Sequence, residues 1–111
     1  MNKARSPITT HILDLARGVA ASGIPVVLER LNGSSWKELA RGTTNADGRI
    51  EDLLTPGSKA EKGTYRLTFD TRTQSTFYPN VTVAFELSDC DRHHHIPLLL
   101  SPFGYSTYRG T

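Results

Sequence analysis

The sequence has a single cysteine, Cys90, among its 111 residues, and no long hydrophobic run. One cysteine cannot form an internal disulfide, so a hydrophobic core must hold the fold together. The apolar runs are far shorter than the roughly 20 residues that a membrane-spanning helix needs. Residues 1–7 lack the apolar segment of a signal peptide. We therefore expect a cytoplasmic protein that does not bind a membrane.

Neither sign of charge dominates. Thirteen lysine and arginine residues are scattered among 11 acidic residues, and the net charge is +2. This distribution gives no support to nucleic-acid binding. The sequence also lacks a serine-centred nucleophile elbow, a phosphate-binding loop and a paired-carboxylate signature. Cys90 lies between Asp89 and Asp91, and acidic neighbours disfavour a reactive thiolate.

Short segments of alternating or β-branched residues fill the chain, with almost no helical period. Glycine, proline, asparagine or aspartate separates them, which predicts an all-β protein with a two-sheet β-sandwich of about eight strands. Residues 72–80 are the one candidate for a short helix. We expect a single domain over residues 8–111, preceded by a flexible segment, residues 1–7. The expected strands are 8–15, 24–31, 36–44, 49–54, 63–71, 81–87 and the segment from 93 onward, and residues 17–23 are expected to form a loop.

Three of the four histidines are consecutive, at positions 93 to 95. Strand side chains alternate, so His93 and His95 should lie on one face and His94 on the other. By the same rule Thr9, His11 and Leu13 share a face of the first strand. Residue chemistry alone leaves two interpretations open: ordinary histidines that are exposed or half-buried and hydrogen-bonded, or a site built from histidine and arginine.

Zinc binding is an alternative for these histidines. His11, His93 and His95 would offer three nitrogen ligands and leave one position for water. The sequence has no cysteine and histidine spacing of the structural-zinc kind, and consecutive strand histidines present only two rings to one face. We therefore predict no metal site.

Three segments resemble the transthyretin-related family of 5-hydroxyisourate hydrolases. They are Thr9–Asp14 (TTHILD), Thr44–Arg49 (TNADGR) and His93–Thr111, which contains IPLLLSP and ends in GYSTYRGT. The resemblance runs from about Ile8 to Thr111. The third segment is the most specific, because its ending separates the hydrolases from the hormone carrier transthyretin.

The resemblance implies a fold, an assembly and a reaction. The fold is the transthyretin-like sandwich with a short helix before the sixth strand, and the assembly is a homotetramer, a dimer of dimers with active sites where dimers meet. The reaction opens the ring of 5-hydroxyisourate to 2-oxo-4-hydroxy-4-carboxy-5-ureidoimidazoline in urate degradation, a part of purine metabolism, and needs no cofactor.

The family's functional residues carry over onto both ends and the middle of this chain. The resemblance implies that His11, Arg49 and His95 are catalytic. It also implies that the terminal residues close the site and bind substrate; these are Tyr108, Arg109, Gly110 and Thr111. The family usually ends in serine, and Thr111 keeps the hydroxyl group.

Two other classes of protein remain as alternatives. The first is a transthyretin-like protein that binds a small aromatic ligand without catalysis, and the second is a β-sandwich that serves only adhesion or interaction. The carrier lacks the set formed by His11, Arg49 and the Tyr-Arg-Gly ending, and an interaction module does not require it. The hydrolase is therefore the favoured interpretation.

Overall fold

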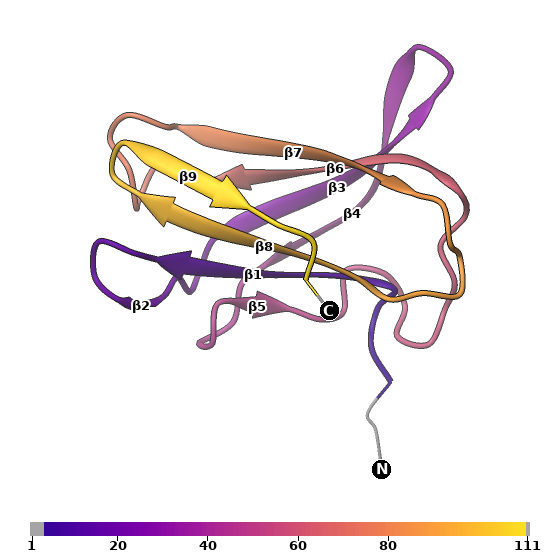
Figure 1. Cartoon of the computed structure of the whole chain (residues 1–111), viewed down its shortest axis with the longest axis horizontal. Coiled ribbons are helices and arrows are strands. Elements are labelled where there is room, and N and C mark those ends of the chain that lie inside the picture. Colours follow the sequence, from indigo (N-terminus) through magenta and orange to yellow (C-terminus); the bar gives the residue numbers. More distant parts are fainter. Residues whose placement is uncertain (1–3, 111) are drawn as a thin grey trace.

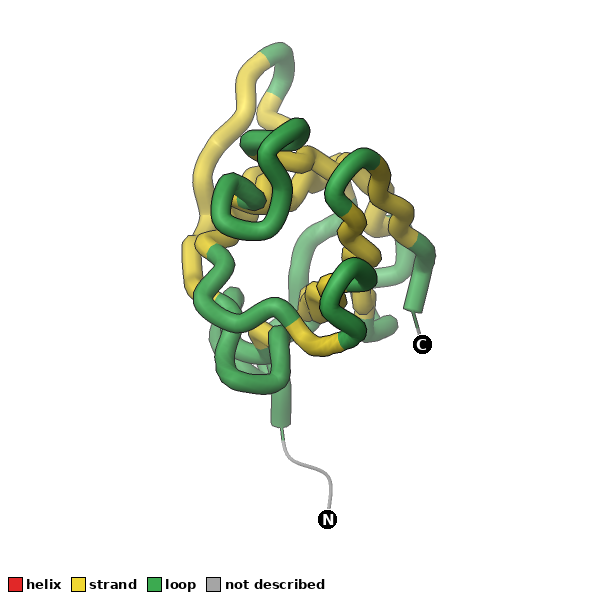
Figure 2. Tube along the Cα trace, turned by 90° about the vertical axis from the view of Figure 1, so that its left-hand side faces the viewer, coloured by secondary structure: helices red, strands yellow, loops and turns green. Residues whose placement is uncertain are grey.

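Two β-sheets packed against each other form the structure, a computed structural model that describes residues 4–110 (Figure 1). Strands and connecting loops account for all of this part of the chain, and it contains no helix (Figure 2). Accordingly, no helix in residues 4–110 is long and apolar enough to cross a membrane. The predicted all-β, two-sheet architecture is confirmed, with nine strands, two of them only two residues long.

The first sheet has five strands in the order β2-β1-β8-β9, and β5 also pairs with β1. β1 runs parallel to β8 along its whole length, and its other edge is shared by β5 and β2. The strands of this sheet are β1 (Ile8–Asp14), β2 (Val19–Ala20), β5 (Arg49–Ile50), β8 (His94–Ser101) and β9 (Gly104–Thr107).

The second sheet has four antiparallel strands in the order β4-β3-β6-β7. Its first hairpin turns at Asn32-Gly33, as the Asn-Gly signal predicts, and Pro25 opens a strand. The strands of this sheet are β3 (Pro25–Asn32), β4 (Ser35–Thr43), β6 (Gly63–Asp70) and β7 (Asn80–Leu87).

Local differences from the expected strands lie in connecting segments. The expected loop at 17–23 contains β2, and the expected strand at 49–54 pairs only over Arg49–Ile50. The segment 71–79 has one helix-like turn, in which the N–H of Ser75 donates to the carbonyl of Thr71, and no helix follows it. The short helix implied by the family resemblance is therefore absent there.

Alternate side chains from both sheets build the core between them. Ile8 and Ile12 of β1 contribute to it together with Leu98 and Leu100 of β8, and all four are fully buried. Burying one such side chain contributes roughly 1.5–3 kcal/mol to stability. Because the inward positions of β1 and β8 are fixed by this core, the intervening residues must point to the outer face of the sheet. Within residues 4–7, Ser6 and Pro7 are also buried.

The turn before β5 holds Arg49 next to β1. The Oδ1 atom of Asn45 accepts hydrogen bonds from the backbone N–H groups of Asp47 and Arg49. Gly48 has a φ of 71°, which favours glycine. This tight turn delivers Arg49 to a position opposite His11 in the β1–β5 pairing.

Replacing Gly48 by alanine should destabilise the protein strongly. An added Cβ would lie 2.6 Å from the carbonyl oxygen of Ile12, in addition to the strain of a positive φ. We expect a loss of about 3 kcal/mol in the free energy of unfolding, measured by urea denaturation. The matched control is Gly33→Ala, at a φ of 66° with nothing within 4 Å, where we expect a loss of about 1 kcal/mol. Equal losses would contradict a role for the contact with β1.

Candidate active site

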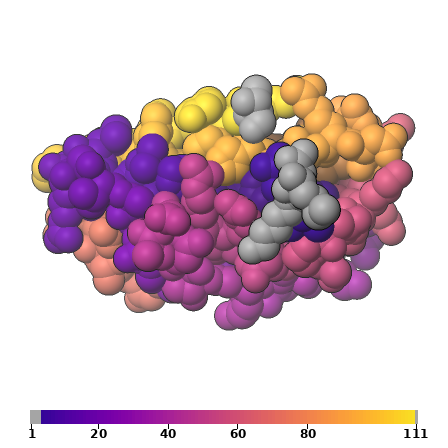
Figure 3. Space-filling view, turned by 90° about the horizontal axis from the view of Figure 1, so that it is seen from below, coloured from indigo at the N-terminus to yellow at the C-terminus, as the bar shows by residue number. Residues whose placement is uncertain are grey.

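Three strands bring the predicted catalytic residues together on the outer face of the five-stranded sheet. His11 on β1 pairs directly with Arg49 on β5. Thr9, on the same face of β1, pairs with His95 on β8. Arg49 and His11 both lower the pKa of His95 through their charges, so the three groups act on one another. Figure 3, seen from below, shows segments from the start, middle and end of the chain meeting on this side of the molecule.

His95 is the most perturbed group of the cluster. Its ring is half-buried, and its Nδ1 atom lies 2.8 Å from Oγ1 of Thr9. Burial lowers its pKa from 6.5 to about 4, aided by the positive charges of His93, Arg49 and other basic neighbours. Both causes disfavour the imidazolium. His95 is therefore neutral at pH 7.

The pKa of His11 is lowered as well. Burial is the largest cause, followed by the guanidinium of Arg49 across the strand pair. A backbone hydrogen bond to Asp47 and its carboxylate act in the opposite direction. His11 is therefore an uncharged imidazole near neutral pH, the form that accepts a proton from water.

A hollow of about 60 Å³ opens beside the cluster. Its lining has two arginines, two histidines and one acid, so it suits an anionic or electron-rich ligand. The side chains come from the N-terminal segment, from β1 and from residues in or next to β5 and β8, and are Arg5, Thr9, Arg49, Glu51, His93 and His95.

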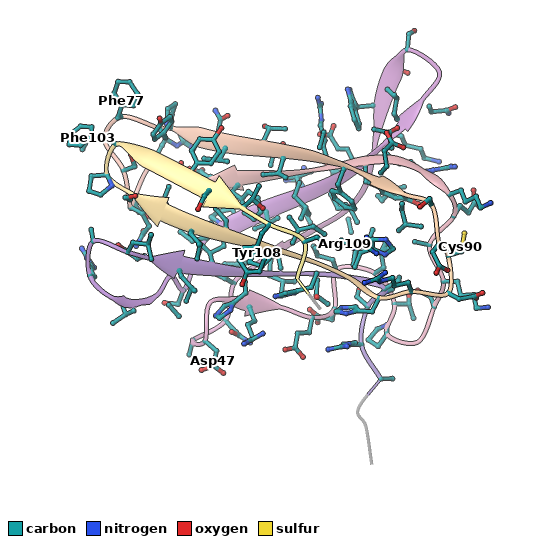
Figure 4. All side chains as sticks on the ribbon, in the orientation of Figure 1. Asp47, Phe77, Cys90, Phe103, Tyr108 and Arg109 are labelled. Carbon is teal, nitrogen blue, oxygen red and sulfur yellow. The ribbon has the colours of Figure 1, made fainter. Side chains whose placement is uncertain are left out.

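Gly110 lies against His95. The backbone N–H of Gly110 donates to the carbonyl of His95 at 2.8 Å. A Cβ at Gly110 would lie 2.6 Å from Cδ2 of that ring, so the approach requires glycine. Tyr108 and Arg109 follow β9 and are exposed (Figure 4). They line a second hollow of about 260 Å³ beside His95. Thr111 lies outside the described residues.

Thr9 and His93, to which the sequence assigned no part in the reaction, belong to the same cluster. Thr9 is buried, and its hydroxyl oxygen lies 2.8 Å from Nε2 of His93 and 2.8 Å from Nδ1 of His95. The alternation of strand side chains already placed both residues on the correct faces, and His94 is buried on the other face. Alternation did not reveal the hydrogen bonds, because they depend on the β1–β8 register.

The histidines do not form a ready metal site within residues 4–110. No group of three or more histidine, cysteine, aspartate or glutamate side chains there is placed to hold a metal ion. His93 and His95 stack, with ring centroids 6.2 Å apart. The zinc alternative therefore gains no support from this part of the chain.

A two-sheet sandwich with this cluster on the outer face of one sheet defines a transthyretin-like protein. The profile of the HIUase/Transthyretin family matches residues 8–110. The chain belongs to that family.

Relatives and solved structures agree with this assignment. The 5-hydroxyisourate hydrolase of Mus musculus is 47% identical over 114 aligned residues, which cover 96% of each chain. The solved 5-hydroxyisourate hydrolase of Klebsiella pneumoniae superposes with a TM-score of 0.79 at 34% identity, over 94% of this chain and 98% of the other. Sea bream transthyretin, solved with thyroxine, superposes with a TM-score of 0.86 at 31% identity, over 96% of each chain.

The lowered pKa of His95 should make stability depend on pH. Its pKa in the folded protein, about 4, lies below the ordinary value of 6.5, so between these values the unfolded chain binds more protons and acidification favours unfolding. Solvent screens a half-buried ring, so we expect His95 to account for a loss of roughly 1–2 kcal/mol between pH 7 and pH 4.5. His95→Gln should reduce the loss seen in urea denaturation by that amount. The same pH dependence in both proteins would contradict the perturbed pKa.

Proposed function

We propose that the protein hydrolyses 5-hydroxyisourate to 2-oxo-4-hydroxy-4-carboxy-5-ureidoimidazoline, a step of urate degradation. The observation that carries the proposal is the convergence of His11, Arg49 and His95 in a chain that matches a hydrolase along nearly its full length. Two uncharged imidazoles and a guanidinium suit the hydrolysis of a cyclic amide. A cytoplasmic location stays a prediction.

The proposed mechanism divides three tasks among the cluster. Water loses a proton to an imidazole and attacks the ring carbonyl, whose oxygen gains negative charge. Arg49 stabilises that oxygen and orients the electron-rich substrate. The C–N bond then breaks, and the leaving nitrogen takes a proton. His11 and His95 share the two proton transfers, and the chemistry requires no cofactor.

The terminal residues complete the site in this proposal. Tyr108 and Arg109 border the hollow next to His95, and Gly110 lies against its ring. We assign substrate contacts to these residues and to the hydroxyl of Thr111. Tyr108 and Arg109 follow β9, so contacts from them to substrate would not interrupt the sheet.

We also propose that the protein is a homotetramer, a dimer of dimers. β7 and β9 are edge strands of the two sheets, and unpaired edges favour pairing with another copy of the chain. The cluster lies on an outer sheet face that a second dimer would cover. Size-exclusion chromatography with light scattering tests the assembly.

Substituting either histidine should remove most of the activity. We expect His11→Asn or His95→Asn to lower turnover by roughly 100-fold or more, the usual effect of losing an acid or base group. The assay generates 5-hydroxyisourate in situ from urate with urate oxidase and follows its decay in the ultraviolet. A folded variant with turnover near that of the unmodified protein would contradict the assignment.

The role of the Arg49 charge is tested by Arg49→Ala, with Arg41→Ala as the matched control. Arg41 is exposed and pairs with Glu38 on β4, in the other sheet, so its loss should leave turnover unchanged.

The same assay tests the transthyretin-like binding alternative, which the likeness to the thyroxine-bound carrier favours. An unchanged decay of the intermediate with added protein would favour binding over catalysis.

The contact of Gly110 with His95 should matter for activity. We expect Gly110→Ala to lower kcat/KM by about 10-fold or more, because the added methyl group displaces the terminal segment or the ring. Gly104→Ala is the control in the same β8–β9 arm, where the nearest atom to an added Cβ lies 4.0 Å away. Equal activity of the two variants would show that the terminal segment does not position His95.

A further inference from the structure

The hydroxyl group of Thr9 joins two imidazole rings. Its oxygen lies 2.8 Å from Nε2 of His93 and from Nδ1 of His95. A hydroxyl has one proton, so it donates to one ring nitrogen and accepts from the other. One of these two nitrogens must therefore carry a proton while the other does not. The tautomers of the two neutral rings are coupled through Thr9.

The environment of His93 favours one of the two arrangements. Its other ring nitrogen, Nδ1, is buried and has no hydrogen-bond partner within residues 4–110. Buried N–H groups without an acceptor are rarer in proteins than acceptors without a donor. The favoured tautomer of His93 therefore has a bare Nδ1 and a proton on Nε2. That proton is donated to Thr9, and the hydroxyl of Thr9 then donates to Nδ1 of His95.

We propose that Thr9 and His93 are positioning residues that hold neutral His95 in the tautomer with its proton on Nε2. The proposal rests on the proposed function, because its purpose is to set the role of His95 in that reaction. Nδ1 of His95 is occupied by Thr9, so Nε2 is the nitrogen left for substrate. It meets the substrate as an N–H donor.

This tautomer divides the roles of the two predicted catalytic histidines. His95 donates a hydrogen bond to the developing oxyanion or to the leaving nitrogen. His11 then accepts the proton of water. The lowered pKa of His11 is consistent with this role, because an uncharged imidazole has a bare nitrogen that can accept a proton.

The strand register makes the arrangement rigid. Thr9 is 2% exposed and pairs with His95 in the parallel β1–β8 ladder. Its neighbour Thr10 points the other way, and its hydroxyl donates to the carbonyl of Ile96 at 2.6 Å. The strand pairing and the burial of Thr9 therefore hold its side chain beside the two rings.

Nitrogen NMR of histidine-labelled protein reads the tautomer directly, without substrate. Protonated and bare ring nitrogens have distinct chemical shifts, and we expect His95 to show a protonated Nε2 and a bare Nδ1 at pH 7. Thr9→Ser keeps the hydroxyl and should keep this pattern. Thr9→Val has nearly the same shape without the hydroxyl and should give a mixture of tautomers. A protonated Nδ1 in the unmodified protein, or an unchanged pattern in Thr9→Val, would overturn the proposal.

Kinetics test the consequence for the reaction. We expect Thr9→Val to lower kcat by about 10- to 100-fold with little change in KM, because a positioning residue acts on the transition state. Thr9→Ser should stay within about threefold of the unmodified protein. A folded Thr9→Val variant with full kcat would overturn the proposal.

A second pair of variants covers the case in which Thr9→Val does not fold. His93→Gln places an amide near the position of Nε2, which can still donate to Thr9, whereas His93→Phe cannot. We expect His93→Gln to keep the tautomer of His95 and His93→Phe to lose it, and equal spectra would overturn the proposal. If the unmodified protein does not turn over 5-hydroxyisourate, the proposed function fails, but the spectra still decide the role of Thr9 and His93.

Discussion

The parallel pairing of β1 with β8 is the constraint on which the rest of the site depends. Its register places Thr9 beside His95 and leaves the other edge of β1 free for Arg49. The core fixes this register, because a shift by one residue would turn Ile8 and Ile12 toward solvent. The side chains of the proposed active site are therefore positioned by the apolar residues between them.

The charge state of the histidine cluster depends on the same strand pairing. Arg49 and three imidazoles lie close together on a partly buried face, so positive charge on any one ring is disfavoured. The cluster stays uncharged on its histidines and keeps a fixed cation on Arg49. A region of this kind attracts an electron-rich ring and still provides a base at neutral pH, which is the combination that hydrolysis of an activated cyclic amide requires.

Alternation and turn signals predicted much of the fold, and the family resemblance predicted the site. The Asn45–Gly48 turn, the opposite faces of His94 and His95, and the pairing of the last residues were all accessible from the sequence. The two-residue strand β2 was not, because residues 17–23 have the glycines of a loop and their pairing depends on distant β1. The hydrogen bonds of Thr9 were missed for the same reason, since they require the relative register of strands more than 80 residues apart.

The pairing of β1 with β8 also determines when the protein can become active during its synthesis. The first strand leaves the ribosome early and has no long partner until the last fifth of the chain emerges. Until then its apolar side chains and open edge stay exposed, which favours aggregation. Pairing of β1 with β8 is slow to form because the two strands are far apart in the sequence. Folding and the assembly of the reactive centre thus become one late event.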